Sequence, residues 1–301
     1  MLMADRLSPT RLFKRDDSIV GKFTAMGCSC EVLMDTDDLA LARKLLQIAS
    51  QEAWRIEKKF SRYNEDNIVH QINTSEGHPV QVDEETAQLL DFADQCFSLS
   101  DGLFDITSGI LRKAWTFDGK NQIPKEQEVS ELLPLVGWKK VTWRRPIIQL
   151  APGMEIDLGG IGKEYAVDRT LQLLRERSDI GLLVNFGGDI AVGGHKRNGL
   201  PWAVGIEDSN STDQAVKTIY LKQGAVATSG DSKKYLFAHG KRYGHILDPL
   251  CGWPVEDAPR SVTVAANSCS EAGFLSTLGI LNGRKAESLL KEADVQSWCY
   301  R

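Results

Sequence analysis

The chain has 301 residues and a formal net charge of −5, with 42% hydrophobic and 26% charged residues. That length allows one large domain or two interlocked lobes around a sizeable core, and the composition is ordinary for a globular protein. The acidic balance argues against a broad nucleic-acid-binding surface, because phosphate contacts require clustered Lys and Arg.

The first hundred residues predict one strand and two long helices. Residues 1–20 are polar and Arg-rich and are expected to form a flexible arm. Apolar residues at mostly even spacing predict a strand over 22–34. Apolar residues at three- and four-residue steps predict amphipathic helices over 39–60 and 84–100, and a short helix is expected between them at 68–73.

The rest of the chain predicts short strands and three further helices. Residues 154–160 read as a strand that runs into a glycine turn, and a helix is expected over 163–177. Gly187-Gly188 interrupts another predicted strand, which indicates a bulge or a close backbone approach. The remaining strands are expected within 136–149, 181–192, 202–206, 217–221, 225–228, 242–247 and 262–266, and the closing helices over 270–281 and 284–293.

Together these elements predict an α+β fold in a single domain over residues 21–301. No repeat, low-complexity tract or obvious linker divides this range. We expect two interlocked lobes with mostly antiparallel sheets flanked by helices.

The ends of the chain and its cysteines bear on location. No apolar run is long enough to span a bilayer, and the first residues lack the apolar core of a signal peptide. The six cysteines show neither a CxxC pair nor the Cys/His spacing of a zinc site. We therefore expect a cytoplasmic protein with reduced thiols.

One segment has the form of a phosphate-binding turn. Asp157-Leu158-Gly159-Gly160-Ile161-Gly162-Lys163 places three glycines and a lysine where a helix begins. Glycines allow backbone amides to approach a ligand, and a helix N-terminus favours a phosphate. The segment is neither GxGxxG nor a P-loop, and a plain turn with a surface lysine explains it equally well.

Four other segments combine glycines, hydroxyls or carboxylates with a turn, where loops often carry function. Taken singly, each is explained as well by a structural role. They are Asp101–Thr107, Asn185–Ile190, Thr228–Asp231 and the segment 245–249, which holds His245 and Asp248.

Taken in order, these segments resemble the motifs of the ApbE-type FAD:protein FMN transferases. Residues 157–168 follow that family's Asp-Leu-Gly-Gly-Ile-x-Lys-x-Tyr-Ala-x-Asp motif almost residue for residue. Further matches are Met26-Gly27, the Phe-Ser-x-Tyr motif at 60–63, the Gly-x-Phe-Asp-x-Thr motif at 102–107, and the segments 185–190, 225–231, 245–255 and, in part, 261–281. The resemblance runs from about residue 22 to the C-terminus.

The resemblance implies an enzyme that binds FAD and, with Mg²⁺, moves FMN to a Ser or Thr hydroxyl of an acceptor flavoprotein, releasing AMP. It implies that Tyr63 stacks on the flavin and that Asp157 and Lys163 contact the cofactor's polar parts. The other residues expected to line the flavin pocket are Met26, Leu103, Phe104, Asp105 and Leu247. The implied partner is a flavoprotein, not a nucleic acid.

The metal site that the resemblance implies is incomplete in this sequence. The family's ligands correspond here to the Gly160 carbonyl and to the helix that carries Ser276 and Thr277. An Asp that the family places four residues before the Thr is replaced by Gly273. Gly273→Asp is expected to be tolerated and to raise Mg²⁺ affinity, unless Phe274 fills the pocket. Asp231 and Asp248 are candidates to replace the missing carboxylate.

Two readings of the function follow. The chain is either an active FMN transferase or an FAD-binding relative that has lost transfer and acts as a carrier or scaffold. FAD hydrolysis without an acceptor is a further alternative on the same fold. If transfer occurs, Asp248 or His245 is expected to accept the proton of the acceptor hydroxyl, with Asp231 as the next candidate.

Overall fold

An eight-stranded antiparallel sheet is the centre of the molecule. The computed structural model describes residues 9–117, 122–208, 211–231 and 234–301. The sheet has the order β1-β2-β3-β7-β8-β11-β14-β15, and every strand pairs antiparallel with its neighbour. Its strands are β1 (Arg11–Arg15), β2 (Ser18–Ala25), β3 (Cys28–Met34), β7 (Leu182–Phe186), β8 (Asp189–Gly193), β11 (Gly224–Gly230), β14 (Ser261–Ala266) and β15 (Gln296–Tyr300).

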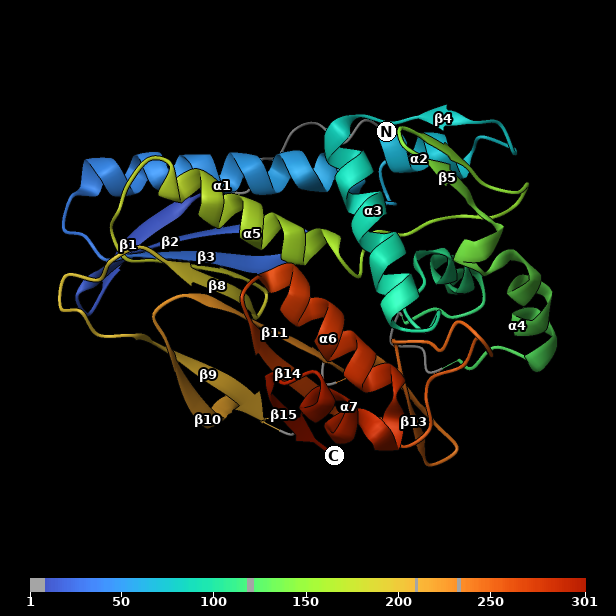
Figure 1. Ribbon diagram of the computed structural model, residues 1–301. Helices are drawn as coiled ribbons and strands as arrows, with labels where there is room; N and C mark the ends of the chain where they lie inside the picture. Colours follow the sequence, from blue (N-terminus) through green and yellow to red (C-terminus); the bar gives the residue numbers. More distant parts are fainter. Residues whose placement is uncertain (1–8, 118–121, 209–210, 232–233) are drawn as a thin grey trace.

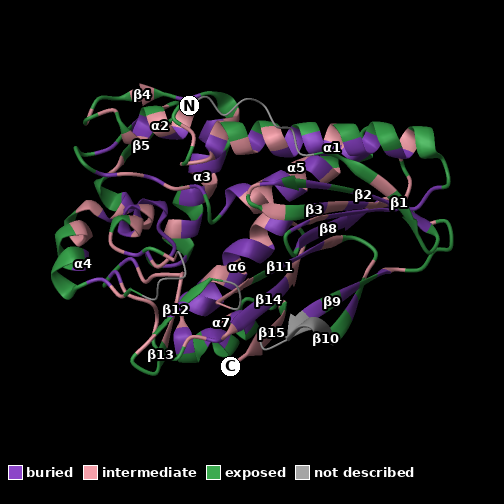
Figure 2. Cartoon of the chain, turned by 180° about the vertical axis from the view of Figure 1, so that it is seen from behind, coloured by how far each residue is buried: buried purple, intermediate pink, exposed green. Residues whose placement is uncertain are grey.

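Three helices cover one face of this sheet, as Figure 1 shows: α1 (Leu39–Phe60), α5 (Gly162–Arg175) and α6 (Cys269–Leu281). Helix α1 begins at Asp38, whose carboxylate accepts hydrogen bonds from the amides of Ala40 and Leu41 at 2.8 and 3.0 Å. Its apolar stripe turns inward, and its outer face is exposed along its length (Figure 2). The short helix α7 (Ala286–Glu292) follows α6 and packs on it.

A two-stranded hairpin covers the opposite face of the sheet. It consists of β9 (Trp202–Asp208) and β10 (Ser211–Leu221). The two strands pair antiparallel, with Trp202 opposite Leu221 and Asp208 opposite Ser211. Its buried side chains form one apolar cluster with four residues of the sheet, namely Leu183, Ile190, Val192 and Val226. The central strands β7 and β8 are thus buried on both faces, whereas the edge strand β1 is largely exposed.

A second lobe adjoins the helix-covered side of the sheet (Figure 1). Its larger elements are α2 (Ile68–Asn73), α3 (Glu84–Leu99), the 3-10 helix η1 (Ile106–Lys113) and α4 (Glu126–Leu132). Its strands are β4 (Val80–Gln81), β5 (Thr142–Arg144), β6 (Ile147–Gln149), β12 (Tyr235–Ala238) and β13 (Lys241–Gly244), and its short 3-10 turns are η2 (Leu133–Leu135) and η3 (Trp138–Lys140). A last one, η4 (Gly283–Lys285), precedes α7. Trp115 centres this lobe's apolar core and donates its indole N–H to the Gly252 carbonyl at 2.8 Å.

The predicted fold class and most predicted elements are confirmed. Within the described residues, no helix is both long and apolar enough to cross a bilayer. The expected arm over residues 1–20 is wrong for residues 11–20, since β1 pairs with β2 along the edge of the sheet. Residues 154–158 are not a strand but an irregular connection. Gly187 and Gly188, with φ of 65° and 103°, form the turn of a β7–β8 hairpin and not a bulge.

Candidate functional site

The glycine turn before α5 is fixed in place by Asp157. Its amide donates to the Ile106 carbonyl at 2.8 Å, and its carboxylate accepts from the Gly159 amide at 2.9 Å. The same carboxylate pairs with Arg62. Helix η1 lies directly against Asp157, because a side chain on Gly109 would overlap its Cβ. This arrangement leaves Gly159 and Gly160 exposed at the N-terminus of α5.

Lys163, in the first turn of α5, reaches the start of β8. Its Nζ lies 2.6 Å from Oδ2 of Asp189, a residue that is only 2% exposed. Burial alone lowers the pKa of Lys163, but the charges of Asp189 and Glu164 outweigh it and raise the pKa above its ordinary value. Lys163 is therefore a permanent cation beside the glycine turn, not the plain surface lysine of the simpler reading.

Glu164 points from α5 to the backbone of α6 at Gly273. A Cβ on Gly273 would lie 2.5 Å from Cγ and 3.1 Å from Cδ of Glu164. Oε2 of Glu164 is fully buried and has no hydrogen-bond partner among the described residues. Burial, and then the charge of Asp189, raise the pKa of the Glu164 carboxyl to about 8.

This contact corrects the expectation about residue 273. A side chain at Gly273 meets the side chain of Glu164, so Gly273→Asp requires Glu164 to adopt another rotamer or the two helices to move apart. Phe274, the other concern, is 7% exposed and packs edge-to-face on Phe104 with ring centroids 5.5 Å apart. It belongs to the main core.

Three hydroxyls meet where α6 crosses β11. Ser229 of β11 lies 2.8 Å from the hydroxyls of both Ser276 and Thr277. Ser276 is fully buried and also donates to the Gly273 carbonyl at 3.0 Å, whereas Thr277 is half-buried. Of the two hydroxyls predicted to bind metal, only that of Thr277 is partly open.

Asp168, the last residue of the long motif, fastens α6 to α5. Its carboxylate accepts hydrogen bonds from the Cys269 amide at 2.7 Å and from the Ser270 amide and hydroxyl at 2.8 and 2.7 Å. Burial raises the pKa of Asp168, and these three donors oppose that shift. Asp168 thereby sets the position of Ser276 and Thr277 relative to the glycine turn.

The residues predicted to line the flavin pocket lie in different surroundings. Tyr63 is 79% exposed, and its ring faces the Arg62 guanidinium, whose carbon is 4.9 Å from the ring centroid. Phe104 is buried beside Gly160, and Leu103 is half-buried next to it. Met26 occupies the β2–β3 turn with a φ of 51°.

Asp105 has a structural role in addition to the predicted one. One carboxylate oxygen accepts from the amide and hydroxyl of Thr107 at 2.8 and 2.6 Å, and the other accepts from the Trp138 amide at 2.8 Å. It therefore caps η1 and ties it to residue 138.

We expect Asp105→Ala to lower the free energy of unfolding by about 2–4 kcal/mol, because it leaves two buried amides without an acceptor. Asp105→Asn, which keeps one acceptor oxygen, should cost less. Urea unfolding of both variants, with an FAD titration alongside, checks this. Normal stability with weakened FAD binding would contradict the capping role.

The two candidate bases are half-buried, and the structure gives each its own partner. His245 contacts the Lys234 carbonyl through Nδ1 at 3.2 Å, and burial lowers its pKa, helped by the charge of Lys234. The Asp248 carboxylate accepts from the Leu250 amide at 2.8 Å. Leu247 packs against the Trp115 core.

Both carboxylates proposed to replace the missing one already accept hydrogen bonds from other residues. Asp231 lies between Arg242 and Arg260, 2.6 and 3.0 Å from their Nε atoms. Asp248 already closes its own turn through the Leu250 amide. The carboxylate that lies against residue 273 is that of Glu164, which occupies an unspecified position of the sequence motif and was missed for that reason.

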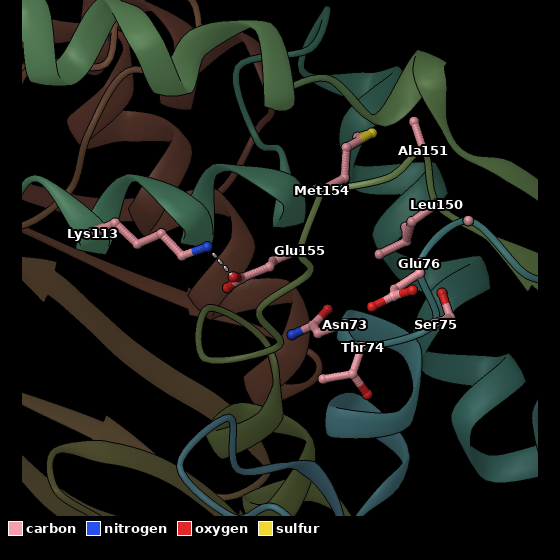
Figure 3. A pocket seen from close by; sticks show the side chains of 11 residues that line it. Asn73, Thr74, Ser75, Glu76, Lys113, Leu150, Ala151, Met154 and Glu155 are labelled. Atoms are coloured by element: carbon pink, nitrogen blue, oxygen red, sulfur yellow. Dashed lines mark ion pairs between the residues drawn. The ribbon is translucent and has the colours of Figure 1, made fainter.

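The described residues offer no larger acidic cluster in place of the missing carboxylate. Across the described ranges of the chain, no group of three or more His, Cys, Asp and Glu side chains is placed to hold a metal ion. A separate surface pocket in the second lobe, shown in Figure 3, lies between residues 73–77 and 150–155, with Lys113 paired to Glu155 at 2.6 Å. None of the predicted flavin or metal residues lines it.

Comparison with known proteins gives consistent matches. The sequence profile of the ApbE family matches residues 26–298. The FAD:protein FMN transferase of Vibrio cholerae is 28% identical over 246 residues, which is 79% of this chain and 73% of that protein. That of Escherichia coli is 29% identical over 242 residues, 77% of this chain and 69% of that protein.

Solved structures match over nearly the whole chain. The ApbE protein of Thermotoga maritima has a TM-score of 0.85 and 32% identity, covering 97% of this chain and 94% of its own. The flavinyl transferase ApbE of Pseudomonas stutzeri has a TM-score of 0.83 and 25% identity, covering 98% and 92%.

Proposed function

Because the chain belongs to the ApbE family of flavin transferases, we propose that it is an FAD:protein FMN transferase that uses Mg²⁺ and an acceptor flavoprotein. The observation that carries the proposal is the assembly at the N-terminus of α5. An open glycine turn and the Lys163 cation lie at the start of α5, and α6, which carries the Thr277 hydroxyl, packs on that helix and is bonded to it through Asp168. Such a site suits a pyrophosphate, since backbone amides and a fixed cation stabilise its negative charge.

In the proposed reaction, the acceptor's Ser or Thr oxygen bonds to the phosphorus of the FMN half. The pyrophosphate bond to AMP breaks, and the hydroxyl proton passes to a base. Lys163 stabilises charge on the phosphates, and Asp157 holds the glycine turn in the binding conformation. Asp248 and His245 are the proposed bases, with Asp248 favoured because a neutral His245 is equally suited to donate a hydrogen bond.

The flavin ring is proposed to lie against Tyr63, Met26, Leu103 and Phe104, with Leu247 closing the pocket from the second lobe. Tyr63 supports this because its large exposed ring is held in place by Arg62 and is available for stacking.

The cation site is proposed to include the Gly160 carbonyl and Thr277, with Ser276 in support. Hydroxyl and carbonyl oxygens suit Mg²⁺, which is usually held by few protein ligands together with substrate phosphates. Bound there, Mg²⁺ would neutralise charge on the pyrophosphate. Ser276 is proposed to support the site indirectly, by holding the Ser229 hydroxyl in position, because the Ser276 side chain itself is buried.

We expect Tyr63→Ala to weaken FAD binding about 5- to 10-fold, since lost stacking corresponds to roughly 1 kcal/mol. Titration of FAD with detection of flavin fluorescence measures this. Tyr63→Phe is the matched control and should bind almost normally. Equal affinity of all three proteins would place the flavin elsewhere.

Release of AMP from FAD separates the proposed enzyme from a relative that only binds the flavin. We expect AMP to form with Mg²⁺ and an acceptor present. AMP formed equally fast without any acceptor would indicate FAD hydrolysis instead. Tight FAD binding with no AMP under either condition would indicate a carrier or scaffold. We further propose that the enzyme acts in the cytoplasm, which a cleaved or lipid-modified N-terminus in the native protein would contradict.

A further inference from the structure

We propose that Glu164 supplies, from helix α5, the cation-binding carboxylate that Gly273 cannot supply from α6. The inference rests on the proposed function, because it assigns a residue to that enzyme's cation site. The two positions are about a hundred residues apart in the chain but adjoin in the fold, where α5 packs on α6.

The space beside Gly273 is filled by the side chain of Glu164. A Cβ at residue 273 would lie 2.5 Å from Cγ and 3.1 Å from both Cδ and Oε1 of Glu164. Real non-bonded carbons do not approach so closely, so a side chain at 273 and the present Glu164 exclude each other. The Glu164 side chain therefore occupies the space that the first side-chain atom of an aspartate at residue 273 would need.

The surroundings of Glu164 provide one cation for two buried carboxyl groups. Oε2 of Glu164 and Oδ2 of Asp189 are both buried, and neither has a hydrogen-bond partner among the described residues, although Asp189 keeps its ion pair with Lys163. One lysine thus faces two carboxylates. A buried carboxylate oxygen without a donor is costly, and a divalent cation is a means of compensating it.

The other oxygen donors lie on the elements that flank Glu164. Gly160 is four residues before it at the N-terminus of α5, and Thr277 is one helical turn after Gly273 on α6. One carboxylate with a hydroxyl, a carbonyl and substrate phosphates is a sufficient set for Mg²⁺, which rarely requires a cage made of protein alone.

The test is a carboxylate exchange between the two helices. Binding of Mn²⁺, as a paramagnetic substitute for Mg²⁺, is measured by electron paramagnetic resonance with the protein alone and with FAD added. We expect Glu164→Gln, which keeps size and removes charge, to weaken Mn²⁺ binding about 10- to 100-fold. Glu164→Gly should weaken it similarly, and the double variant Glu164→Gly with Gly273→Asp should recover most of the affinity.

Two single variants at residue 273 serve as controls. Gly273→Ala adds the steric conflict without a charge, and Gly273→Asp adds both. Both should lower the melting temperature while Glu164 is present, and Gly273→Asp should not improve Mn²⁺ binding unless Glu164 is removed. Recovery confined to the double variant is the signature of one carboxylate site served from either helix.

Normal Mn²⁺ affinity in Glu164→Gln would overturn the inference, and so would a double variant that binds no better than Glu164→Gly. These outcomes are separate from failure of the proposed function. If the native chain does not bind FAD, the proposed function fails, while the Mn²⁺ series without FAD still decides the role of Glu164. If FAD binds normally and the Mn²⁺ affinity is unchanged by substitution of Glu164, only the inference about Glu164 fails.

Discussion

Replacing Lys163 with methionine is expected to reduce AMP release from FAD by about 100- to 1,000-fold, the usual effect of removing a group that stabilises transition-state charge. Lys163 is the cation that the fold fixes beside the open glycine turn, and its partner Asp189 is 2% exposed. The substitution also leaves Asp189 buried without its cation. We therefore expect the free energy of unfolding to fall as well, by about 2–3 kcal/mol. The loss is smaller than for a fully buried ion pair, because Lys163 itself is partly exposed.

The double variant Lys163→Met with Asp189→Asn separates the two effects. It removes the unpaired buried charge, so the free energy of unfolding should recover while AMP release stays low. Urea unfolding and the AMP assay are run on both variants. If AMP release recovers together with stability, Lys163 acts only as a structural partner of Asp189, and the proposal that Lys163 contacts the phosphates is wrong.

Removing the carboxylate of Asp168 is expected to lower both stability and activity. Asp168→Ala eliminates three hydrogen bonds to the first turn of α6, which together should be worth about 2–4 kcal/mol. Activity should also fall about tenfold or more, because Thr277 depends on the position of α6, and small misplacements of catalytic groups are costly. Urea unfolding measures the loss of stability and AMP release measures the loss of activity, with Mn²⁺ binding as a further probe of the site.

Ser270→Ala is the matched control for Asp168→Ala. It removes one of the three donors and leaves both amides bonded, so it should cost about 1 kcal/mol and leave Mn²⁺ affinity nearly unchanged. An Asp168→Ala protein that unfolds like the native chain would mean that Ser268, which also caps α6, holds the helix unaided.

Periodicity predicted the elements well where a helix or strand is half-buried. Helix α1 has a regular inward stripe and a clear Asp38 cap, and its range was predicted correctly. Strand β1 was missed because its residues are largely exposed at the edge of the sheet, so no alternation marks it. The segment 154–158 has the apolar pattern of a strand, but its Asp157 amide bonds to the Ile106 carbonyl of η1, and it pairs with none of the described strands.

The motifs predicted a candidate site, but they do not indicate which of its side chains meet in the fold. The pairing of Lys163 with Asp189 and the contact of Thr277 with Ser229 depend on the order of strands in the sheet. The contact of Glu164 with Gly273 could not be predicted for the same reason. From the sequence alone, Gly273 indicates a missing metal ligand. Only the packing of α5 on α6 shows that the carboxylate of Glu164 lies beside it.

The central claim is that this chain transfers FMN although Gly273 replaces a carboxylate. The most direct measurement incubates the native protein with FAD, Mg²⁺ and a purified acceptor flavoprotein, then determines by mass spectrometry whether FMN is covalently attached to an acceptor Ser or Thr. We predict one attached FMN for each AMP released, and none when Mg²⁺ is removed by a chelator. An unmodified acceptor, with FAD bound by the protein but left intact, would contradict the claim.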